Sequence, residues 1–373
     1  MGNSGLKSEK VLFLSLHTFS LTGGIEKVCR CISKILSDLN ITKNNTHQLM
    51  SLYDDQPDLR YVNTGDFKGL RGKRLAFLLN TIRLGRKANT ILLSHINLLL
   101  FAWILKKIQP QKRIILLAHG IEIWEKLPKW KTTFLRKHTE IWAVSHFTAQ
   151  QIEKTHQLNP SMIKVLPNGL DPFFPIPTHF EKPGKLLQQY RLSTSNKILF
   201  TLTRLSSHEQ YKGYDQVILA LKNLPEEVVY VLAGKADDTE KKRVLTLVEQ
   251  HHLTHRVILT GFLEETALQD YFLLSDLFVM PSQGEGFGIA FIEAAACGRF
   301  SIAGNADGSR NALLNGKLGC FVDPHHIHEI ETAISKQLED SKSTADASGL
   351  QQACLNAFSF EQYRINFLNL LSN

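Results

Sequence analysis

The stretch SQGEGFGIAFIEAAACG, residues 282–298, decides the fold of this chain. It follows the apolar run 277–280 and leads through three glycines into a helical pattern, which predicts a strand, a turn and a helix in succession. Such a unit belongs to doubly wound parallel sheets, where ligands bind at the turns that follow the strands. The glycines allow the backbone to approach a ligand closely, because no Cβ intervenes.

Two acidic residues give this stretch the character of a binding site. A helix that begins near Gly288 offers N–H groups and the positive end of its dipole to a phosphate. Glu293, about one turn inside that helix, is placed to accept from a ribose hydroxyl, and Glu285 in the loop from a sugar hydroxyl. The competing interpretation is a glycine-rich turn with two solvated glutamates. The coincidence of both acids with three glycines and a helix start favours the binding site.

The alternation of short apolar runs and helical patterns continues on both sides of this stretch. Five prolines within residues 167–187 interrupt it, which predicts an interdomain linker there. We therefore expect an α/β protein with two Rossmann-like doubly wound domains facing a central cleft. The domains are an N-terminal one over 1–178 and a C-terminal one over 188–355, with a C-terminal helix in 356–373 that crosses back. The predicted strands are 11–16, 91–94, 113–118, 141–144 and 162–166, then 198–203, 228–233, 257–260, 277–280 and 300–303.

Composition limits the class of protein. The chain has 373 residues, of which 43% are hydrophobic and 21% are charged, as in a globular protein of two domains. The longest apolar stretch, 91–105, contains polar residues and predicts a strand followed by a helix rather than a membrane span. The five cysteines are mostly isolated, which indicates reduced thiols and a cytoplasmic location.

Charge is distributed unevenly between the two halves. Residues 1–180 hold 25 Lys and Arg against 12 Asp and Glu, whereas residues 181–373 hold 18 against 23. Residues 71–87 predict a basic amphipathic helix, and a second basic patch with an aromatic residue lies in 126–137. These segments could be solvated surface, or they could dock on anionic lipid at the cytoplasmic face of an inner membrane. No nucleic-acid partner is expected, since recognisable recognition modules are lacking.

Two cations follow the first strand of the second domain. Arg204 and Lys212 would stabilise the charge that develops on a leaving nucleoside diphosphate, Arg as a fork and Lys as a point charge. Each alone could be a surface cation. We expect no metal and no cofactor, because neither acidic pair, 54–55 nor 237–238, makes an Asp-x-Asp pattern. The histidines in 325–328 predict the solvated start of a helix.

His119 ends an apolar strand of the first domain, where a doubly wound sheet places its ligands. It is therefore a candidate catalytic residue, although a single histidine is also often structural. Glu122 and Trp124 follow it and could shape an acceptor site or simply form a packed helix start.

Together these motifs resemble glycosyltransferase family 4, the retaining enzymes of GT-B fold, over essentially the whole chain. Glu285 and Glu293 match the family's E-x7-E signature, and the Gly23-Gly24 loop is similar to its N-terminal Gly-Gly loop. The resemblance implies a metal-independent hexosyltransferase with His119, Arg204, Lys212 and Glu285 in catalysis. It implies an acceptor site at Gly23, Glu122 and Trp124, and a donor site at Gly24, Arg204, Lys212, Gly261, Phe262, Glu285, Gly286, Phe287, Gly288 and Glu293.

One loop departs from the family pattern. Many members carry a Gly-Gly-x-x-Glu-like loop where this chain has GNADGSR, residues 304–310, so the donor stays open between GDP-mannose and a UDP-hexose. The expected acceptor is a hydroxyl of a glycan or lipid-linked molecule, in bacterial surface polysaccharide or lipopolysaccharide synthesis. Two alternatives remain: a nucleotide-sugar epimerase of GT-B fold, and a non-enzymatic basic protein that binds membrane or nucleic acid.

Overall fold

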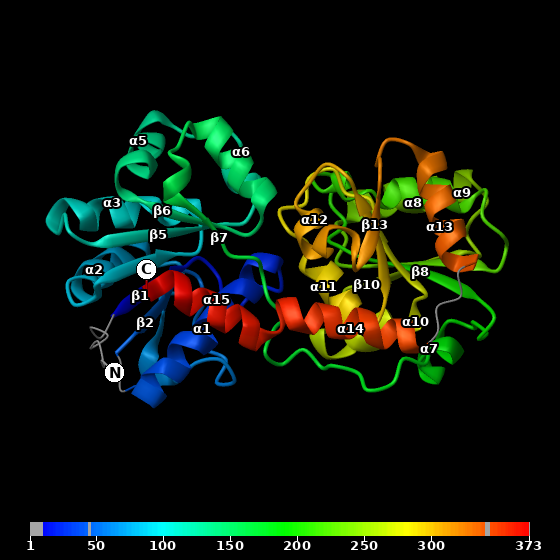
Figure 1. Cartoon of the computed structure of the whole chain (residues 1–373), viewed down its shortest axis with the longest axis horizontal. Helices are drawn as coiled ribbons and strands as arrows, with labels where there is room; N and C mark the ends of the chain where they lie inside the picture. The colour runs from blue at the N-terminus through cyan, green and yellow to red at the C-terminus, as the bar shows by residue number, and fades with distance from the viewer. Residues whose placement is uncertain (1–9, 44–45, 340–343, 373) are drawn as a thin grey trace, which may run out of the picture. The chain divides into compact units, whose positions relative to one another are not determined.

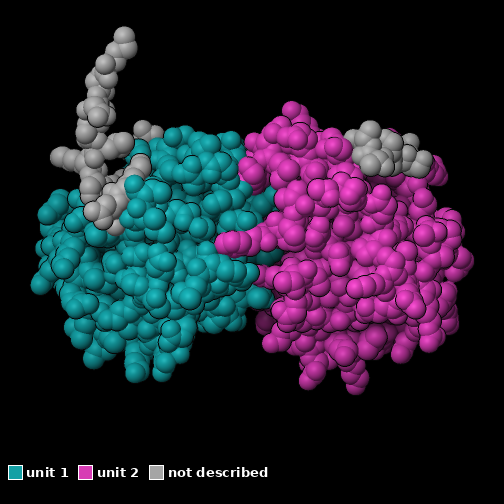
Figure 2. Space-filling model, turned by 90° about the horizontal axis from the view of Figure 1, so that it is seen from below, with its two compact units in different colours: residues 1–172, 360–373 teal, residues 173–359 magenta. Residues whose placement is uncertain are grey.

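The computed structural model describes residues 10–43, 46–339 and 344–372, and the chain splits into two compact units (Figures 1 and 2). Unit 1 comprises Met1–Pro172 and Phe360–Asn373, and unit 2 comprises Phe173–Ser359. The first boundary lies within the proline-rich segment 167–187, and the second separates the last two helices. The C-terminal helix is thus part of unit 1, although the chain that precedes it belongs to unit 2.

Unit 1 is built on a seven-stranded parallel sheet of order β3-β2-β1-β4-β5-β6-β7. The chain moves outward from β1 to β3, then returns to β4 beside β1 and continues to the other edge. The strands are β1 Val11–Ser15, β2 Gln48–Ser51, β3 Phe67–Gly69, β4 Thr90–Leu93, β5 Arg113–Ala118, β6 Glu140–Ala143 and β7 Ile163–Val165. The helices are α1 Gly24–Lys43, α2 Arg74–Gly85, α3 Leu99–Ile108, α4 Ile121–Trp124, α5 Lys129–His138, α6 His146–His156 and α15 Phe360–Ser372.

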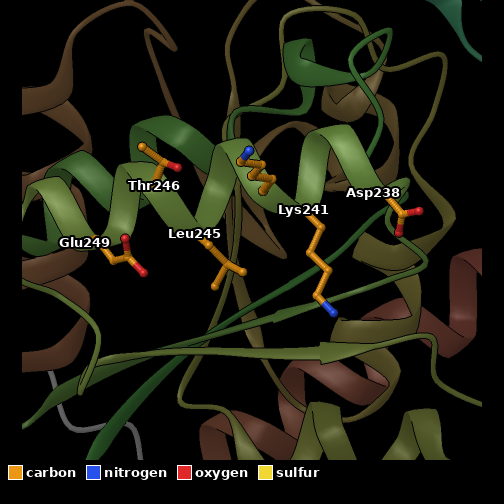
Figure 3. Close-up of a pocket in the computed structure, with 6 residues that line it drawn as sticks. Asp238, Lys241, Leu245, Thr246 and Glu249 are labelled. Atoms are coloured by element: carbon orange, nitrogen blue, oxygen red, sulfur yellow. The ribbon is translucent and has the colours of Figure 1, made fainter.

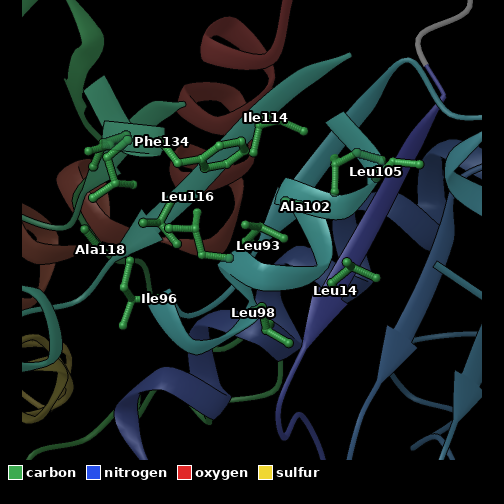
Figure 4. Close-up of a cluster of buried hydrophobic side chains, with 14 of the residues drawn as sticks. Leu14, Leu93, Ile96, Leu98, Ala102, Leu105, Ile114, Leu116, Ala118 and Phe134 are labelled. Carbon is green, nitrogen blue, oxygen red and sulfur yellow. The ribbon is translucent and has the colours of Figure 1, made fainter. Parts of the chain in front are cut away.

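Helices cover both faces of this sheet. Alternate strand residues such as Leu14, Leu93 and Leu116 form one apolar cluster with side chains of α2, α3 and α5, as Figure 4 shows for part of it. Trp142 of β6 lies between two members of that cluster in sequence, so it points to the opposite face. There its ring meets Phe367 of α15 at 5.5 Å. Burial on both faces explains why the strands are almost continuously apolar.

Unit 2 repeats the plan with six parallel strands in the order β10-β9-β8-β11-β12-β13. Its strands are β8 Lys197–Leu202, β9 Val228–Ala233, β10 Val257–Gly261, β11 Leu277–Met280, β12 Phe300–Gly304 and β13 Gly319–Val322. Its helices are α7 Gly184–Gln189, α8 Tyr214–Leu221, α9 Asp238–Gln250, α10 Leu268–Leu274, α11 Ile289–Ala296, α12 Ser309–Ala312, α13 Ile327–Glu339 and α14 Thr344–Phe358. Side chains of α8, α9 and α13 cover one face, and the aromatic rings of Phe200, Phe272, Phe278 and Phe291 pack on the other.

The predicted fold class, two doubly wound α/β sheets, is confirmed. Three short strands, β2, β3 and β13, were not predicted, because each offers only one to three apolar residues. The predicted helix over 71–87 begins later, at Arg74, because Arg71 and Gly72 have left-handed φ values of 49° and 78°. Among the described helices, none is both long and apolar enough to cross a bilayer.

Candidate functional site

The candidate site of unit 2 lies where the strand order reverses. β8 and β11 are neighbours, but the chain proceeds from them in opposite directions, to β9 and to β12. Loops diverge at such a switch point and leave room for a ligand at the carboxyl ends of the strands. The loop after β8 carries Lys212 and the loop after β11 carries Glu285, and the two side chains form an ion pair. The structure therefore brings together two of the residues predicted from sequence.

The Lys212–Glu285 pair is largely shielded from solvent. The two side chains are only 15% and 14% exposed, and the Lys212 ammonium also lies 5.2 Å from the centre of the Tyr211 ring. Burial lowers the pKa of Lys212, but the charges of Glu285, Tyr211 and Glu209 and the hydrogen bond to Glu285 together outweigh burial and raise the pKa to about 12. Lys212 is therefore a fixed positive charge at every physiological pH.

Close backbone approaches explain the glycines on either side of this pair. Gly213 follows Lys212 with φ of 82°, and a Cβ there would lie 2.3 Å from the carbonyl oxygen of Pro281. Gly288 has φ of 90° and precedes α11, where a Cβ would lie 2.4 Å from the ring of Phe291. Both positions require glycine for conformation and for space. The loops after β8 and β11 are thus packed directly against each other.

A buried carboxylate that sequence reasoning missed holds the Glu285 loop in place. Asp307, in the loop after β12, is 1% exposed and accepts from the backbone N–H of Glu285 at 2.8 Å. It also accepts from the backbone N–H and the hydroxyl of Ser309, at 3.0 and 2.5 Å. Burial raises the pKa of Asp307 to about 6, although these hydrogen bonds oppose the rise. Its only sequence signal is the Asp-Gly pair within the loop that departs from the family pattern.

A second missed residue, Glu240, fixes the Lys212 segment from the other side. This carboxylate in the first turn of α9 is buried and accepts from Gln210 Nε2 at 3.0 Å and from the hydroxyl of Tyr214. Burial would raise the pKa of Glu240, but hydrogen bonds from Arg243, Tyr214 and Gln210 lower it to about 2. Since Gln210 and Tyr214 flank Lys212, the network anchors both ends of the segment that carries the cation.

Apart from Gly24, which lies in unit 1, the other predicted donor residues lie in unit 2 with different exposures. Arg204 is 64% exposed and pairs with Glu209 at 3.3 Å, while Gly261 and Phe262 are exposed at the end of β10. Glu293 is buried within α11. Phe287 is buried, and its ring meets that of Phe358 at 5.6 Å. Their contacts with a donor, like those of Gly286, stay predictions.

In unit 1 the switch point lies between β1 and β4. His119, at the end of β5, places its Nε2 2.9 Å from the carbonyl oxygen of Ser94 after β4, and Glu122 accepts from the His119 backbone N–H at 2.6 Å. Trp124 packs on the apolar core and meets Phe147 at 5.3 Å, which is the packed helix start considered from sequence. Whether these residues contact an acceptor stays a prediction.

The loop after β1 is fixed by Asp54, which sequence reasoning considered only as a metal ligand. This buried carboxylate accepts from the backbone N–H groups of Thr18 and Ser20, at 2.6 and 2.8 Å. The same loop leads to Gly23 and to Gly24, the first residue of α1. Asp54 therefore sets the backbone path into the Gly-Gly segment.

One hollow lies elsewhere in unit 2, among residues that the sequence did not single out as a site. The hollow in Figure 3 runs along the exposed side of α9, and its lining comes from that one helix: Asp238, Lys241, Lys242, Leu245, Thr246 and Glu249. Within the described residues, no group of three or more His, Cys, Asp or Glu side chains could hold a metal ion. Four of the cysteines, Cys29, Cys31, Cys297 and Cys354, are buried thiols.

Comparisons with known proteins agree with this architecture. Residues 185–349 match the family model Glycosyl transferases group 1. The chain is 28% identical over 253 residues to the GDP-mannose-dependent alpha-(1-6)-phosphatidylinositol monomannoside mannosyltransferase of Mycolicibacterium smegmatis, covering 63% of each protein. It is also 28% identical over 225 residues to the serotype-specific mannosyltransferase WbdA of Escherichia coli, covering 57% of this chain and 27% of WbdA. The chain thus spans less than two thirds of the length of these relatives.

The fold agrees over nearly the whole chain with solved structures. Anabaena HepE in complex with UDP and glucose superposes with a TM-score of 0.77 at 20% identity, covering 98% of this chain and 99% of HepE. At that identity the likeness shows the fold alone. The chain therefore has the GT-B fold, and within it residues 185–349 of unit 2 match the glycosyl transferases group 1 model.

Proposed function

We propose that this protein transfers a hexosyl residue from a nucleotide-diphosphate sugar to a hydroxyl of a glycan or lipid-linked acceptor, with retention of anomeric configuration. The observation that carries the proposal is the Lys212–Glu285 ion pair at the β8/β11 switch point, beside the start of α11. We assign the donor to unit 2 and the acceptor to unit 1.

The site supplies what a leaving diphosphate needs. Lys212 has three N–H donors, and Glu285 engages one of them, so the ammonium keeps capacity for phosphate oxygens. The first-turn N–H groups of α11 lack intrahelical acceptors and lie next to Gly288 in the same loop. A cation and helix N-terminus that are fixed before the reaction stabilise the developing negative charge without reorganisation.

The relatives narrow the substrates that are worth testing. The printed names of two relatives describe mannosyltransferases, one of them dependent on GDP-mannose, and a matching structure holds UDP and glucose. We therefore propose GDP-mannose or a UDP-hexose as donor. A bacterial surface polysaccharide or lipopolysaccharide intermediate is our proposed class of acceptor. We propose no metal in the transfer, with Lys212 and Arg204 as the positive charges on the diphosphate.

A thermal-unfolding screen tests the proposal. The full chain is heated with GDP-mannose, UDP-glucose, UDP-galactose and N-acetylated UDP-sugars, because a ligand that binds the folded state raises the unfolding temperature. We expect one donor to raise the unfolding temperature of wild type and of Lys222→Ala, which changes the exposed lysine that follows α8, but not of Lys212→Ala. No response to any donor, or an equal response in both variants, would overturn the proposed donor site.

Product analysis separates transfer from epimerisation. The donor found in the screen is incubated with the protein in the absence of an acceptor, and the sugar nucleotide is then identified. A transferase returns the donor unchanged apart from slow hydrolysis to the nucleoside diphosphate. An epimerised sugar nucleotide would contradict transfer and establish the epimerase alternative.

A further inference from the structure

Unit 1 contains a long segment without negative charge. Residues 67–121 hold eleven Lys and Arg and neither Asp nor Glu. Two helices, α2 and α3, lie within this segment, and α5 that follows adds four Lys and Arg with no acidic residue. By contrast α1, on the opposite face of the sheet, contains both Glu26 and Asp38. The positive charge is therefore concentrated on one face of the unit.

The three acid-free helices are neighbours on that face. Phe77 of α2 meets Phe101 of α3 at 4.8 Å, and Trp103 of α3 meets Trp130 of α5 at 6.4 Å. Their inner sides are buried in one apolar cluster over the sheet, where Figure 4 shows Ala102 and Leu105 of α3 together with Phe134 of α5. We call the outer sides of α2, α3 and α5 the three-helix face.

Large apolar side chains are exposed on the three-helix face among the cations. Leu75 and Leu79, one turn apart on α2, are 71% and 59% exposed, and Leu100 on α3 is also exposed. Trp103 and Trp130 are exposed too, and each carries a lysine ammonium over its ring: Lys107 at 5.5 Å and Lys131 at 5.9 Å. Amphipathic aromatic rings with adjacent lysines are typical of residues at a membrane–water interface.

We propose that the three-helix face docks this protein on an anionic phospholipid bilayer, with Leu75, Leu79, Trp103 and Trp130 entering the headgroup region. Lysine and arginine attract anionic headgroups, and the apolar side chains strengthen binding in proportion to the apolar area that they bury. Exposed leucines favour lipid over nucleic acid, since a phosphate backbone offers them nothing to bury in. The proposal stands apart from the transfer reaction, because it rests on the charge and exposure of these helices alone.

The cations on this face are close enough to affect one another. The pKa of His138, at the end of α5, is lowered first by burial and then by the charges of Lys106, Lys137 and Lys107. Two of these lysines belong to α3 and one to α5, so both helices contribute to one positive field. Anionic lipid would relieve this repulsion.

Flotation with lipid vesicles tests the proposal on the full chain. We expect it to bind vesicles that contain phosphatidylglycerol, to bind phosphatidylcholine vesicles at least tenfold less, and to be released by salt, because salt screens the attraction. Lys107→Ala with Lys131→Ala should weaken binding roughly thirtyfold, from the typical contribution of two surface cations. Leu75→Ser with Leu79→Ser should weaken it roughly tenfold.

A matched control comes from α9, which exposes Leu245 beside Lys241 and Lys242. Replacing Leu245 by Ser, or both lysines by Ala, should leave vesicle binding unchanged. The proposal is overturned if the variants of the three-helix face and the control variants of α9 lose vesicle binding equally, or if the wild-type chain binds no vesicles. A dimer that forms through the three-helix face and excludes vesicles would overturn it as well.

Tryptophan emission supplies a readout of position. The chain has four tryptophans, of which Trp142 is buried and Trp124 packs on the core, so Trp103 and Trp130 are the exposed pair. Brominated lipid should quench the wild type, and Trp103→Phe with Trp130→Phe should bind equally well but lose the quenching. Unchanged quenching in that variant would overturn the lipid assignment. So would binding to duplex DNA, if the DNA competed with vesicles and still bound after the two Leu→Ser changes.

Discussion

The two switch points hold their loops in different ways. In unit 2, two charged side chains from different loops pair with each other, Lys212 with Glu285, and the buried Asp307 accepts from the Glu285 backbone. In unit 1, Asp54 accepts from backbone N–H groups alone, and His119 contacts a backbone carbonyl. Unit 2 therefore presents a fixed charge that suits an anionic ligand, whereas unit 1 fixes a backbone path and suits a neutral hydroxyl.

The largest effect should follow from removing the fixed charge. We expect Lys212→Ala to lower release of the nucleoside diphosphate by about 10²- to 10³-fold, the typical loss for one group that stabilises a developing anion. Release is measured in single turnover with the donor identified by thermal unfolding. Lys222→Ala, at the exposed residue that follows α8, is the control and should match wild type. A loss of less than twofold in Lys212→Ala would remove this residue from the diphosphate site.

The next effect concerns Asp307, which positions Glu285 without facing the ligand itself. Asp307→Asn keeps the size of the side chain but replaces one of its two acceptor oxygens by an NH2 group, so it can no longer accept from Glu285 and Ser309 with separate oxygens. We expect donor affinity at pH 7 to fall by about tenfold, the usual consequence of one buried hydrogen bond to a charged group. Calorimetric titration measures the affinity, with Asp270→Asn, at an exposed residue of α10, as the control. Equal affinities in the two variants would contradict a positioning role.

Asp307 should also make donor affinity and the free energy of unfolding depend on pH in opposite directions. Because burial raises the folded pKa of Asp307 from 3.8 to about 6, its contribution to stability is present below 3.8 and is lost as the pH rises through 6. The carboxylate, however, is the form that accepts all three hydrogen bonds. Donor affinity should therefore increase from pH 5 to pH 7 in wild type while this contribution to the free energy of unfolding decreases. Asp307→Asn should lack both trends. If Asp307→Asn showed the same pH dependence of donor affinity and of the free energy of unfolding as wild type, Asp307 could not be their source.

The sequence predicted the candidate donor-site residues better than the residues that hold their loops in place. Lys212 and Glu285 lie next to glycines whose spacing marks loops after strands, so their patterns are local. The supports act across the chain: Asp307 is 22 residues from Glu285, Glu240 is 30 from Gln210, and Asp54 is 36 from Thr18. Such pairs depend on the order of strands in the sheet, which the alternation of strands and helices does not specify. The alternation of strands and helices was enough to predict the fold class. The short strands β2, β3 and β13 could not be predicted, because each has only one to three apolar residues.

A smaller and purely local effect is expected from Asp54 in unit 1. Asp54→Asn should speed amide hydrogen exchange at Thr18 and Ser20, since their buried acceptor is weakened. Donor affinity should stay within twofold of wild type, because we assign the donor to unit 2. Asp55→Asn is the matched control, as its exposed side chain pairs with Arg71 instead. If Asp54→Asn weakened donor binding as strongly as Asp307→Asn, the division of roles between the two switch points would be wrong.

The smallest effect separates the two cations of unit 2. Arg204 is mostly exposed and its pair with Glu209 is 3.3 Å long, so solvent and salt screen its charge. We expect Arg204→Ala to weaken donor binding only about threefold at low salt and not at all at high salt, as exposed pairs typically contribute little. Lys212→Ala, which removes the shielded cation, should instead weaken donor binding by the same factor at every salt concentration. Donor titrations over a range of salt measure both, with exposed Lys185→Ala as control. A loss in Arg204→Ala that salt does not diminish would show that ligand binding buries this side chain, which would make it an equal partner of Lys212 on the diphosphate.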